Sequence, residues 1–176
     1  MKKILVVVDF QNDFVDGSLG FPGAEKLEEP ILKLVKEYSA NGHEVVFTTD
    51  VHEEDYLETE EGKHLPIIHC QRGSKGALMY GKIQELSKGY KVFDKGAFGS
   101  DLLLKHLQTD YYDEIDICGL DSSICVTANA VVAKVACPNA HIRVLAYASG
   151  SGDKTAEEHA YKALERLQIE IVRKED

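Results

Sequence analysis

Short runs of apolar and β-branched residues recur along the chain, and segments with helical spacing separate them. The first run, Ile4–Val8, is apolar at every position, as expected for a strand that is buried on both faces. Alternation of such runs with helical segments predicts a parallel sheet covered by helices. Six strands are expected, at Ile4–Val8, Glu44–Thr49, Tyr90–Phe93, Ile115–Cys118, His141–Ala146 and Ile169–Val172.

The segments between these runs carry apolar residues three or four positions apart, which is the period of an amphipathic helix. In the first of them Leu27, Ile31 and Leu34 share one face, and Asn41-Gly42 gives a stop signal. The pattern predicts an α/β fold: a single domain over residues 1–176, with three α/β/α layers and a six-stranded, mainly parallel, Rossmann-like sheet. Helices are expected at Glu25–Ala40, Ala77–Leu86, Asp101–Leu107, Ser123–Ala136 and Lys154–Leu167.

Composition and charge narrow the range of partners. The chain of 176 residues has 20 Lys and Arg against 30 Asp and Glu, a formal net charge of −10, which disfavours nucleic acid and anionic membrane surfaces. No apolar run approaches the roughly 18 residues of a membrane span. The run after Met1-Lys2-Lys3 ends at Asp9 and is too short for a signal peptide. We therefore expect a cytoplasmic protein that acts on a small molecule, with a homo-oligomer as an open possibility.

Groups that can carry chemistry follow four of the predicted strands. Asp9 and Asp50 come directly after the first two strands, Lys95 follows the third, and Cys125 lies a few residues beyond the fourth. A single such residue is usually a cap or a solvated turn. The carboxyl ends of parallel strands, however, share the rim where α/β sheets bind ligands. We therefore expect these four side chains to converge on one site.

Cys125 differs from the other three cysteines in its position. Cys118 and Cys137 fall within a strand and at a helix end, where a free cysteine is typically a small core residue, and Cys70 is also assigned to packing. Cys125 falls near a helix N-terminus, where amide dipoles favour the thiolate and free N–H groups can receive an oxyanion. With Asp9 as a base and Lys95 holding both groups ionised, the sequence predicts a cysteine nucleophile.

A second group of polar residues lies in the long segment from Asp50 to about Lys75. Asp50 and His52 are two residues apart on an extended chain and point to the same side, and His64 and His69 follow in the loop. Mixed nitrogen and oxygen ligands suit Zn²⁺, Mn²⁺ or Fe²⁺ better than Ca²⁺. The spacing alone is equally compatible with solvated histidines in a polar loop.

Five motifs in these regions resemble one known family, the isochorismatase-like cysteine hydrolases, and above all its nicotinamidase/pyrazinamidase branch. The resemblance extends over nearly the whole chain and implies the isochorismatase-like hydrolase fold. The motifs lie within Val6–Phe14, Thr49–His52, Leu65–Gly76, Phe93–Phe98 and Gly119–Val126.

The resemblance implies a role for each of the matching residues. Asp9, Lys95 and Cys125 correspond to the catalytic triad: the cysteine attacks a carboxamide carbon, Asp9 transfers the proton, ammonia leaves and water hydrolyses the thioester. The amides of Asp121 and Cys125 correspond to the oxyanion hole, with a cis peptide bond between Leu120 and Asp121. The residues implied to bind the substrate are Phe14, Leu19 and Phe98.

The resemblance also implies a divalent metal, zinc or alternatively manganese or iron, that binds the ring nitrogen of the substrate. Asp50, His52 and His69 correspond to its ligands. The fourth ligand is aligned through Pro66 to Glu61, with Glu58 and His64 as less favoured substitutes. The implied function is a nicotinamidase that converts nicotinamide to nicotinate and ammonia in NAD salvage and pyridine nucleotide biosynthesis.

Three departures from the family pattern keep alternatives open. Ser122-Ser123 replaces the usual Thr-Asp, the usual Tyr-Ser-Ala-Phe is shortened to Gly96–Phe98, and the chain has no Trp. These changes leave the triad intact but affect the surroundings of the substrate. The first alternative is a hydrolase of the same fold that acts on a carbamoyl or ureido compound. The second is a non-catalytic binding protein on this fold.

Overall fold

A computed structural model, which describes residues 1–174, contains one six-stranded sheet in which every strand pair is parallel. The strand order is β3-β2-β1-β4-β5-β6, so the chain builds outward from β1 in both directions. The α/β fold predicted from the sequence is confirmed, and the mainly parallel sheet is entirely parallel. The strands are β1 (Lys3–Val8), β2 (Glu44–Asp50), β3 (Lys91–Lys95), β4 (Glu114–Gly119), β5 (His141–Ser149) and β6 (Glu170–Val172).

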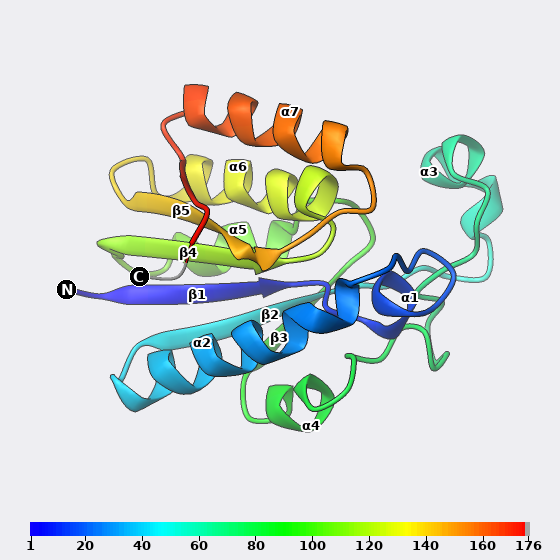
Figure 1. Ribbon diagram of the computed structural model, residues 1–176, viewed down its shortest axis with the longest axis horizontal. Helices are drawn as coiled ribbons and strands as arrows, with labels where there is room; N and C mark the ends of the chain where they lie inside the picture. The colour runs from blue at the N-terminus through cyan, green and yellow to red at the C-terminus, as the bar shows by residue number, and fades with distance from the viewer. Residues whose placement is uncertain (175–176) are drawn as a thin grey trace.

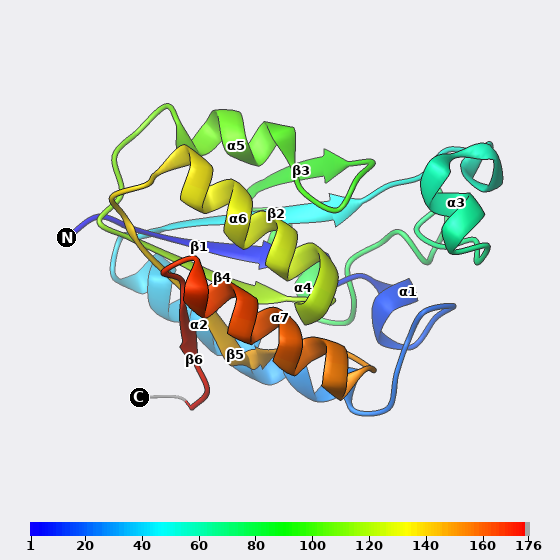
Figure 2. The ribbon, with the colours of Figure 1, turned by 90° about the horizontal axis from the view of Figure 1, so that it is seen from above.

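Helices cover both faces of the sheet and give the predicted three layers (Figures 1 and 2). One face carries α5 (Asp101–Leu107), α6 (Thr127–Ala136) and α7 (Lys154–Arg166), and the other carries α2 (Glu28–Ala40) and α4 (Ile83–Ser87). Among residues 1–174, no helix has the length and apolar character that a membrane span requires. The remaining elements are α1 (Asn12–Val15), α3 (Glu60–His64) and the short turns η1 (Ala24–Leu27), η2 (Tyr56–Glu58) and η3 (Ser122–Val126).

Alternate residues of β1 supply two separate cores, one on each face of the sheet. Leu5 and Val7 belong to the apolar cluster on the α2 side, whereas Ile4, Val6 and Val8 belong to the cluster under α5, α6 and α7. All five side chains are fully buried. This double burial explains why the strand is apolar at every position instead of alternating between apolar and polar residues.

The expected helix over Ala77–Leu86 is wrong for most of its length. Met79 instead forms an antiparallel bridge with Gln11, and the amide of Tyr80 donates to the carbonyl of Phe10 at 2.9 Å. Gly81 has a φ of +53°, which interrupts a right-handed helix, so only Ile83–Ser87 is helical. The segment thus closes over the chain that leaves β1, a contact too distant in sequence for a local pattern to reveal.

Other element boundaries differ by less. The predicted helix at Glu25–Ala40 begins with the 3₁₀ turn η1 before α2, and that at Ser123–Ala136 begins with the π-helical turn η3 before α6. The third strand extends to Lys95, since Lys95 pairs with Asp50 in the ladder between β2 and β3. The long polar segment after β2 contains η2 and α3 and lies at the carboxyl end of the sheet (Figures 1 and 2).

Gly119 ends β4 at a point where the backbone of β1 approaches closely. Its φ is +119°, and a Cβ atom added there would lie 2.0 Å from the carbonyl oxygen of Val8. We predict that Gly119→Ala lowers the free energy of unfolding by at least about 2 kcal/mol, because it combines an unfavourable backbone conformation with a collision against main chain that cannot rotate away. Urea-induced unfolding measures the change.

Gly23→Ala is the matched control for this substitution. Gly23 has a φ of +92°, but nothing lies within 4 Å of an added Cβ atom. This variant therefore carries the conformational cost alone, about 1 kcal/mol. Equal destabilisation of the two variants would contradict the importance of the contact between Gly119 and Val8.

Candidate active site

The four side chains predicted to converge do meet at the carboxyl end of the sheet. Asp9 follows β1, Asp50 and Lys95 end the neighbouring strands β2 and β3, and Cys125 lies in η3 just after β4. All four are buried, with Cys125 5% exposed and Asp9 fully enclosed. Asp9 has a φ of +46°, in the left-handed region, a conformation that costs a residue other than glycine about 1 kcal/mol or more. Such strained backbone is common at functional sites.

Lys95 is the centre of this group. Its Nζ lies 2.7 Å from Asp9 Oδ2, 3.5 Å from Asp50 Oδ1 and 3.6 Å from Cys125 Sγ. The ammonium also donates to the carbonyl of Ala97 at 3.0 Å, and its side chain is 1% exposed. One cation thus holds two carboxylates and a thiol from three other segments of the chain within reach of one another.

Burial and mutual charge set the protonation of these groups. Burial raises the pKa of Asp9. The positive charge of Lys95 lowers this pKa and the negative charge of Asp50 raises it, and the net result is a pKa above its ordinary value. Burial and the nearby Asp9 carboxylate hold the pKa of the Cys125 thiol well above its ordinary value. Although burial opposes its charge, Lys95 has a raised pKa because anionic groups surround it. This direction is opposite to the lowering of the Cys125 pKa that is expected from the helix N-terminus.

The turn that carries Cys125 has an uncommon backbone. The peptide bond between Leu120 and Asp121 is cis, which confirms that part of the resemblance. The five residues that follow form the π-helical turn η3, a feature that is frequent at functional sites. The Asp121 carboxylate accepts hydrogen bonds from the amide and hydroxyl of Ser123, at 2.8 and 2.7 Å.

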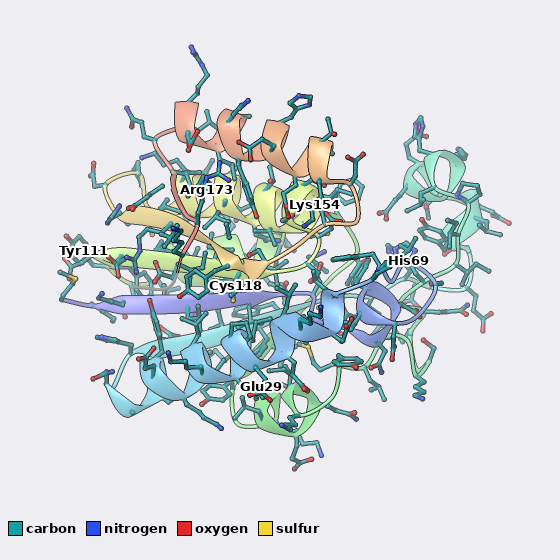
Figure 3. All side chains as sticks on the ribbon, in the orientation of Figure 1. Glu29, His69, Tyr111, Cys118, Lys154 and Arg173 are labelled. Atoms are coloured by element: carbon teal, nitrogen blue, oxygen red, sulfur yellow. The ribbon has the colours of Figure 1, made fainter. Side chains whose placement is uncertain are left out.

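Four side chains gather beside this group in an arrangement that fits a metal ion. Asp50, His52, Glu61 and His69 each offer one ligand atom, and these four atoms all lie within 4.8 Å of one another. Asp50 Oδ2 is 2.8 Å from His52 Nε2 and 3.3 Å from His69 Nε2, and Glu61 Oε1 is 3.7 Å from both imidazole nitrogens. Figure 3 places His69 at the end of the sheet opposite Tyr111. Two nitrogens and two carboxylate oxygens form a suitable donor set for zinc.

The orientation of His69 supports this assignment. Its Nδ1 lies 2.8 Å from the carbonyl oxygen of Ile67, so Nδ1–H donates there and Nε2 faces the other three ligand atoms. Although burial opposes ionisation, hydrogen bonds from the two imidazoles keep the pKa of Asp50 well below its usual range. Burial opposes the charge of His69 too, yet its bonds to Asp50 and Ile67 raise its pKa.

The structure discriminates among the sequence candidates for the fourth ligand. It brings Glu61 into the cluster with 16% of its side chain exposed, whereas His64 is 79% exposed and pairs with Glu60 on the surface. Glu58 is exposed as well. Burial and the neighbouring Asp50 raise the pKa of Glu61. Both substitutes considered for Glu61 therefore lie outside the cluster.

The residues implied to contact the substrate lie around the two groups. Phe14 is buried with its ring edge against His69, at 5.6 Å between ring centroids, while Phe98 is 45% exposed. Leu19 is half-buried and lines the same surface hollow as Ile124 and Asp121. The positions of all three are compatible with walls of a substrate site, and their roles stay predictions.

Several buried residues that sequence reasoning did not assign hold the site together. Gln11 accepts from the amide of Asp50 and donates to its carbonyl, both at 2.8 Å, and Thr48 donates to Asp9 at 2.7 Å. Tyr56 packs against the rings of His52 and His69, with centroids 4.6 and 5.0 Å away. Gln11 lies inside the first motif and could have been found there, whereas no local signal marks Thr48 or Tyr56.

Comparison with known proteins gives consistent matches over this whole architecture. The family model described as the isochorismatase domain matches residues 3–176. A Bacillus subtilis protein described as an uncharacterized isochorismatase family protein is 33% identical over 175 residues, 92% of each chain. The nicotinamidase/pyrazinamidase of Mycobacterium tuberculosis is 31% identical over 144 residues, covering 73% of this chain and 76% of that one. The pyrazinamidase of Pyrococcus horikoshii, solved in complex with zinc, has a TM-score of 0.84 at 25% identity, covering 99% of this chain and 100% of that one.

Proposed function

Since the chain belongs to the isochorismatase family, we propose that it is a metal-dependent cysteine amidohydrolase that converts nicotinamide and water to nicotinate and ammonia. The observation that carries the proposal is the position of Lys95, which contacts Asp9, Cys125 and the candidate metal ligand Asp50. These contacts join the proposed nucleophile, the proposed base and the candidate metal ligands in one continuous group of side chains. With this substrate the enzyme would act in NAD salvage, in the cytoplasm.

The reaction first requires removal of the proton from the Cys125 thiol. Asp9 takes this proton as the thiol sulfur attacks the amide carbon, and Lys95 offsets the negative charge that the sulfur and the carboxylate share. The amides of Asp121 and Cys125 receive the oxygen of the tetrahedral intermediate. Asp9 then returns the proton to the leaving nitrogen, so ammonia departs and a thioester remains on Cys125.

The second half of the reaction consumes water. Asp9 accepts a proton from a water molecule that attacks the thioester carbon, the bond to sulfur breaks, and Cys125 regains its proton. Nicotinate is released and the site returns to its starting state. A divalent metal held by Asp50, His52, Glu61 and His69 would supply a Lewis-acid site for the ring nitrogen of the substrate.

Ammonia release from a panel of amides tests the proposal. The purified protein is compared on nicotinamide and on an N-carbamoyl amino acid at equal concentrations. A higher kcat/KM for nicotinamide supports the proposal. Preference for the carbamoyl compound would favour the related hydrolase, and no release from any amide would favour a binding protein.

The metal has a test that does not depend on turnover. We predict that Glu61→Gln weakens zinc affinity by roughly tenfold or more, because a neutral amide oxygen is a poorer zinc ligand than a carboxylate. Zinc retained during titration with a chelator gives the affinity directly. The proposed metal role also predicts that full chelation abolishes nicotinamide hydrolysis and that zinc, manganese or iron restores it.

Glu60→Gln is the matched control for this titration. Glu60 is the neighbouring residue of α3, 80% exposed, and pairs with His64 and Lys63 on the surface. Its substitution is expected to leave zinc affinity unchanged. Equal affinities of the Glu61→Gln variant and the wild type would remove Glu61 from the set of ligands.

A further inference from the structure

A buried hydrogen bond joins the turn of Cys125 to helix α7. Ser122 is fully buried, and its hydroxyl donates to the Glu157 carboxylate in the first turn of α7. The other carboxylate oxygen of Glu157 lies 3.0 Å from Lys154 Nζ, and its side chain is 14% exposed.

Ser122 is fixed at each of its polar atoms. Its amide donates to the carbonyl of Gly150 at 2.8 Å, and its carbonyl accepts from the hydroxyl of Thr127 at 2.8 Å. With its hydroxyl held by Glu157, the residue has little freedom to move. Ser122 directly follows Asp121, so it controls where the Asp121 amide lies relative to Cys125.

The geometry points to Ser122 and Glu157 as positioning residues for the proposed oxyanion hole, whose donors lie at Asp121 and Cys125. This inference rests on the proposed function. Neither residue touches the substrate; they act through the position of the Asp121 amide. The carbonyl oxygen of the substrate becomes an oxyanion only as the reaction proceeds. A displaced N–H donor therefore weakens binding of the transition state more than binding of the substrate.

The neighbouring departure from the family pattern, Ser123, has contacts of a different kind. Ser123 binds the Asp121 carboxylate, and its hydroxyl lies 3.4 Å from that of Ser151. The hydrogen bonds of the Asp121 carboxylate to Ser123 thus cap the start of η3. Of these three residues, Ser122 is the one whose side chain bonds a residue of α7 directly, whereas Ser123 reaches Ser151, which accepts from the amide of the α7 N-cap Asp153. Ser122 is therefore the appropriate residue to substitute.

The test compares Ser122→Ala and Glu157→Ala, singly and together, on nicotinamide. Each single variant is expected to lower kcat by roughly 10- to 100-fold while KM stays within about twofold, because donor misplacement affects the transition state. The double variant is expected to lose no more than either single one, since both remove the same bond. Ser122→Thr keeps the hydroxyl and is expected to retain kcat within about threefold.

A second measurement separates positioning from general destabilisation. Pyridine-3-carbaldehyde adds the Cys125 thiol across its carbonyl: a carbon–sulfur bond forms, the carbonyl π bond breaks and the oxygen becomes the anion or takes the thiol proton. Its dissociation constant is expected to rise in both alanine variants by about the factor by which kcat falls. Binding of nicotinate is expected to stay unchanged.

Controls cover folding and the dependence on the proposed function. Glu158→Ala, one residue along α7, removes a surface pair with Arg173 at 3.0 Å and is expected to keep wild-type kcat. If the alanine variants do not fold, Glu157→Gln, which keeps the volume and an acceptor oxygen, is expected to lower kcat by a smaller factor. Three results would overturn the inference alone: an unchanged kcat in folded variants, a KM that rises by as much as kcat falls, or additive effects in the double variant. Wild-type protein that hydrolyses no amide would overturn the proposed function and this inference together.

Discussion

Replacing Cys125 by alanine is expected to reduce nicotinamide hydrolysis by about 10⁴-fold or more, because no other group near Asp9 can form the thioester. Cys125 Sγ is the one sulfur among residues 1–174 that contacts Lys95. The variant removes a single buried atom and should fold normally. Nicotinate should still bind, since the candidate metal ligands and Phe14 are untouched. Ammonia release gives the loss of turnover, and calorimetry gives the retained affinity.

Cys118→Ala is the control for this experiment. Cys118 lies in β4, beside Val7 of β1, and is fully buried in the apolar cluster on the α2 side of the sheet (Figure 3). Its substitution is expected to cost stability but leave kcat within about twofold, because its sulfur contacts no reacting group. Turnover by Cys125→Ala at a tenth of the wild-type rate or more would contradict the nucleophilic role.

The second large effect is expected for Lys95→Met, in both activity and stability. Methionine keeps the length of the side chain but leaves the carboxylates of Asp9 and Asp50 buried without their cation. Breaking a buried ion pair in this way costs about 3–5 kcal/mol. Hydrolysis is expected to fall by about 10³-fold or more, since Asp9 can no longer ionise beside the sulfur. Urea-induced unfolding and ammonia release measure the two effects on one sample.

Adding Asp9→Asn to Lys95→Met separates stability from chemistry. The double variant removes one of the unpaired charges, so part of the lost unfolding free energy should return. Activity should not return, because the asparagine cannot accept a proton. Recovery of hydrolysis in the double variant would show that Lys95 serves only to hold the fold.

Much of the architecture follows from the sequence because the signals are local. Ile4–Val8 is apolar at every position, and this pattern alone indicates a strand between two layers of helices. Placing Asp9, Asp50, Lys95 and Cys125 at successive strand ends then requires only the rule that parallel strands end on one rim. The roles of these residues are less local and depended on resemblance.

What the sequence did not predict depends on contacts between distant segments. The segment around Met79 has helical spacing, yet pairing with Gln11 draws it into an extended path. The thiol of Cys125 lies near helix amides, yet burial and the Asp9 carboxylate raise its pKa. Glu157 lies 35 residues from Ser122, and no local pattern connects the two. In each case tertiary packing outweighs the local preference.

The residues of the site follow four different strands, so enzymatic activity can also serve as a measure of correct folding. Asp50 and Lys95 are partners in one ladder, and Val8 and Gly119, which precede Asp9 and the Cys125 turn, are partners in another. A slip of one residue in either ladder would turn the following side chain to the opposite face of the sheet. A refolded sample that hydrolyses amide must therefore have β1, β2, β3 and β4 in native register. A simple ammonia assay would report on chain topology that spectroscopic measures of strand content cannot resolve.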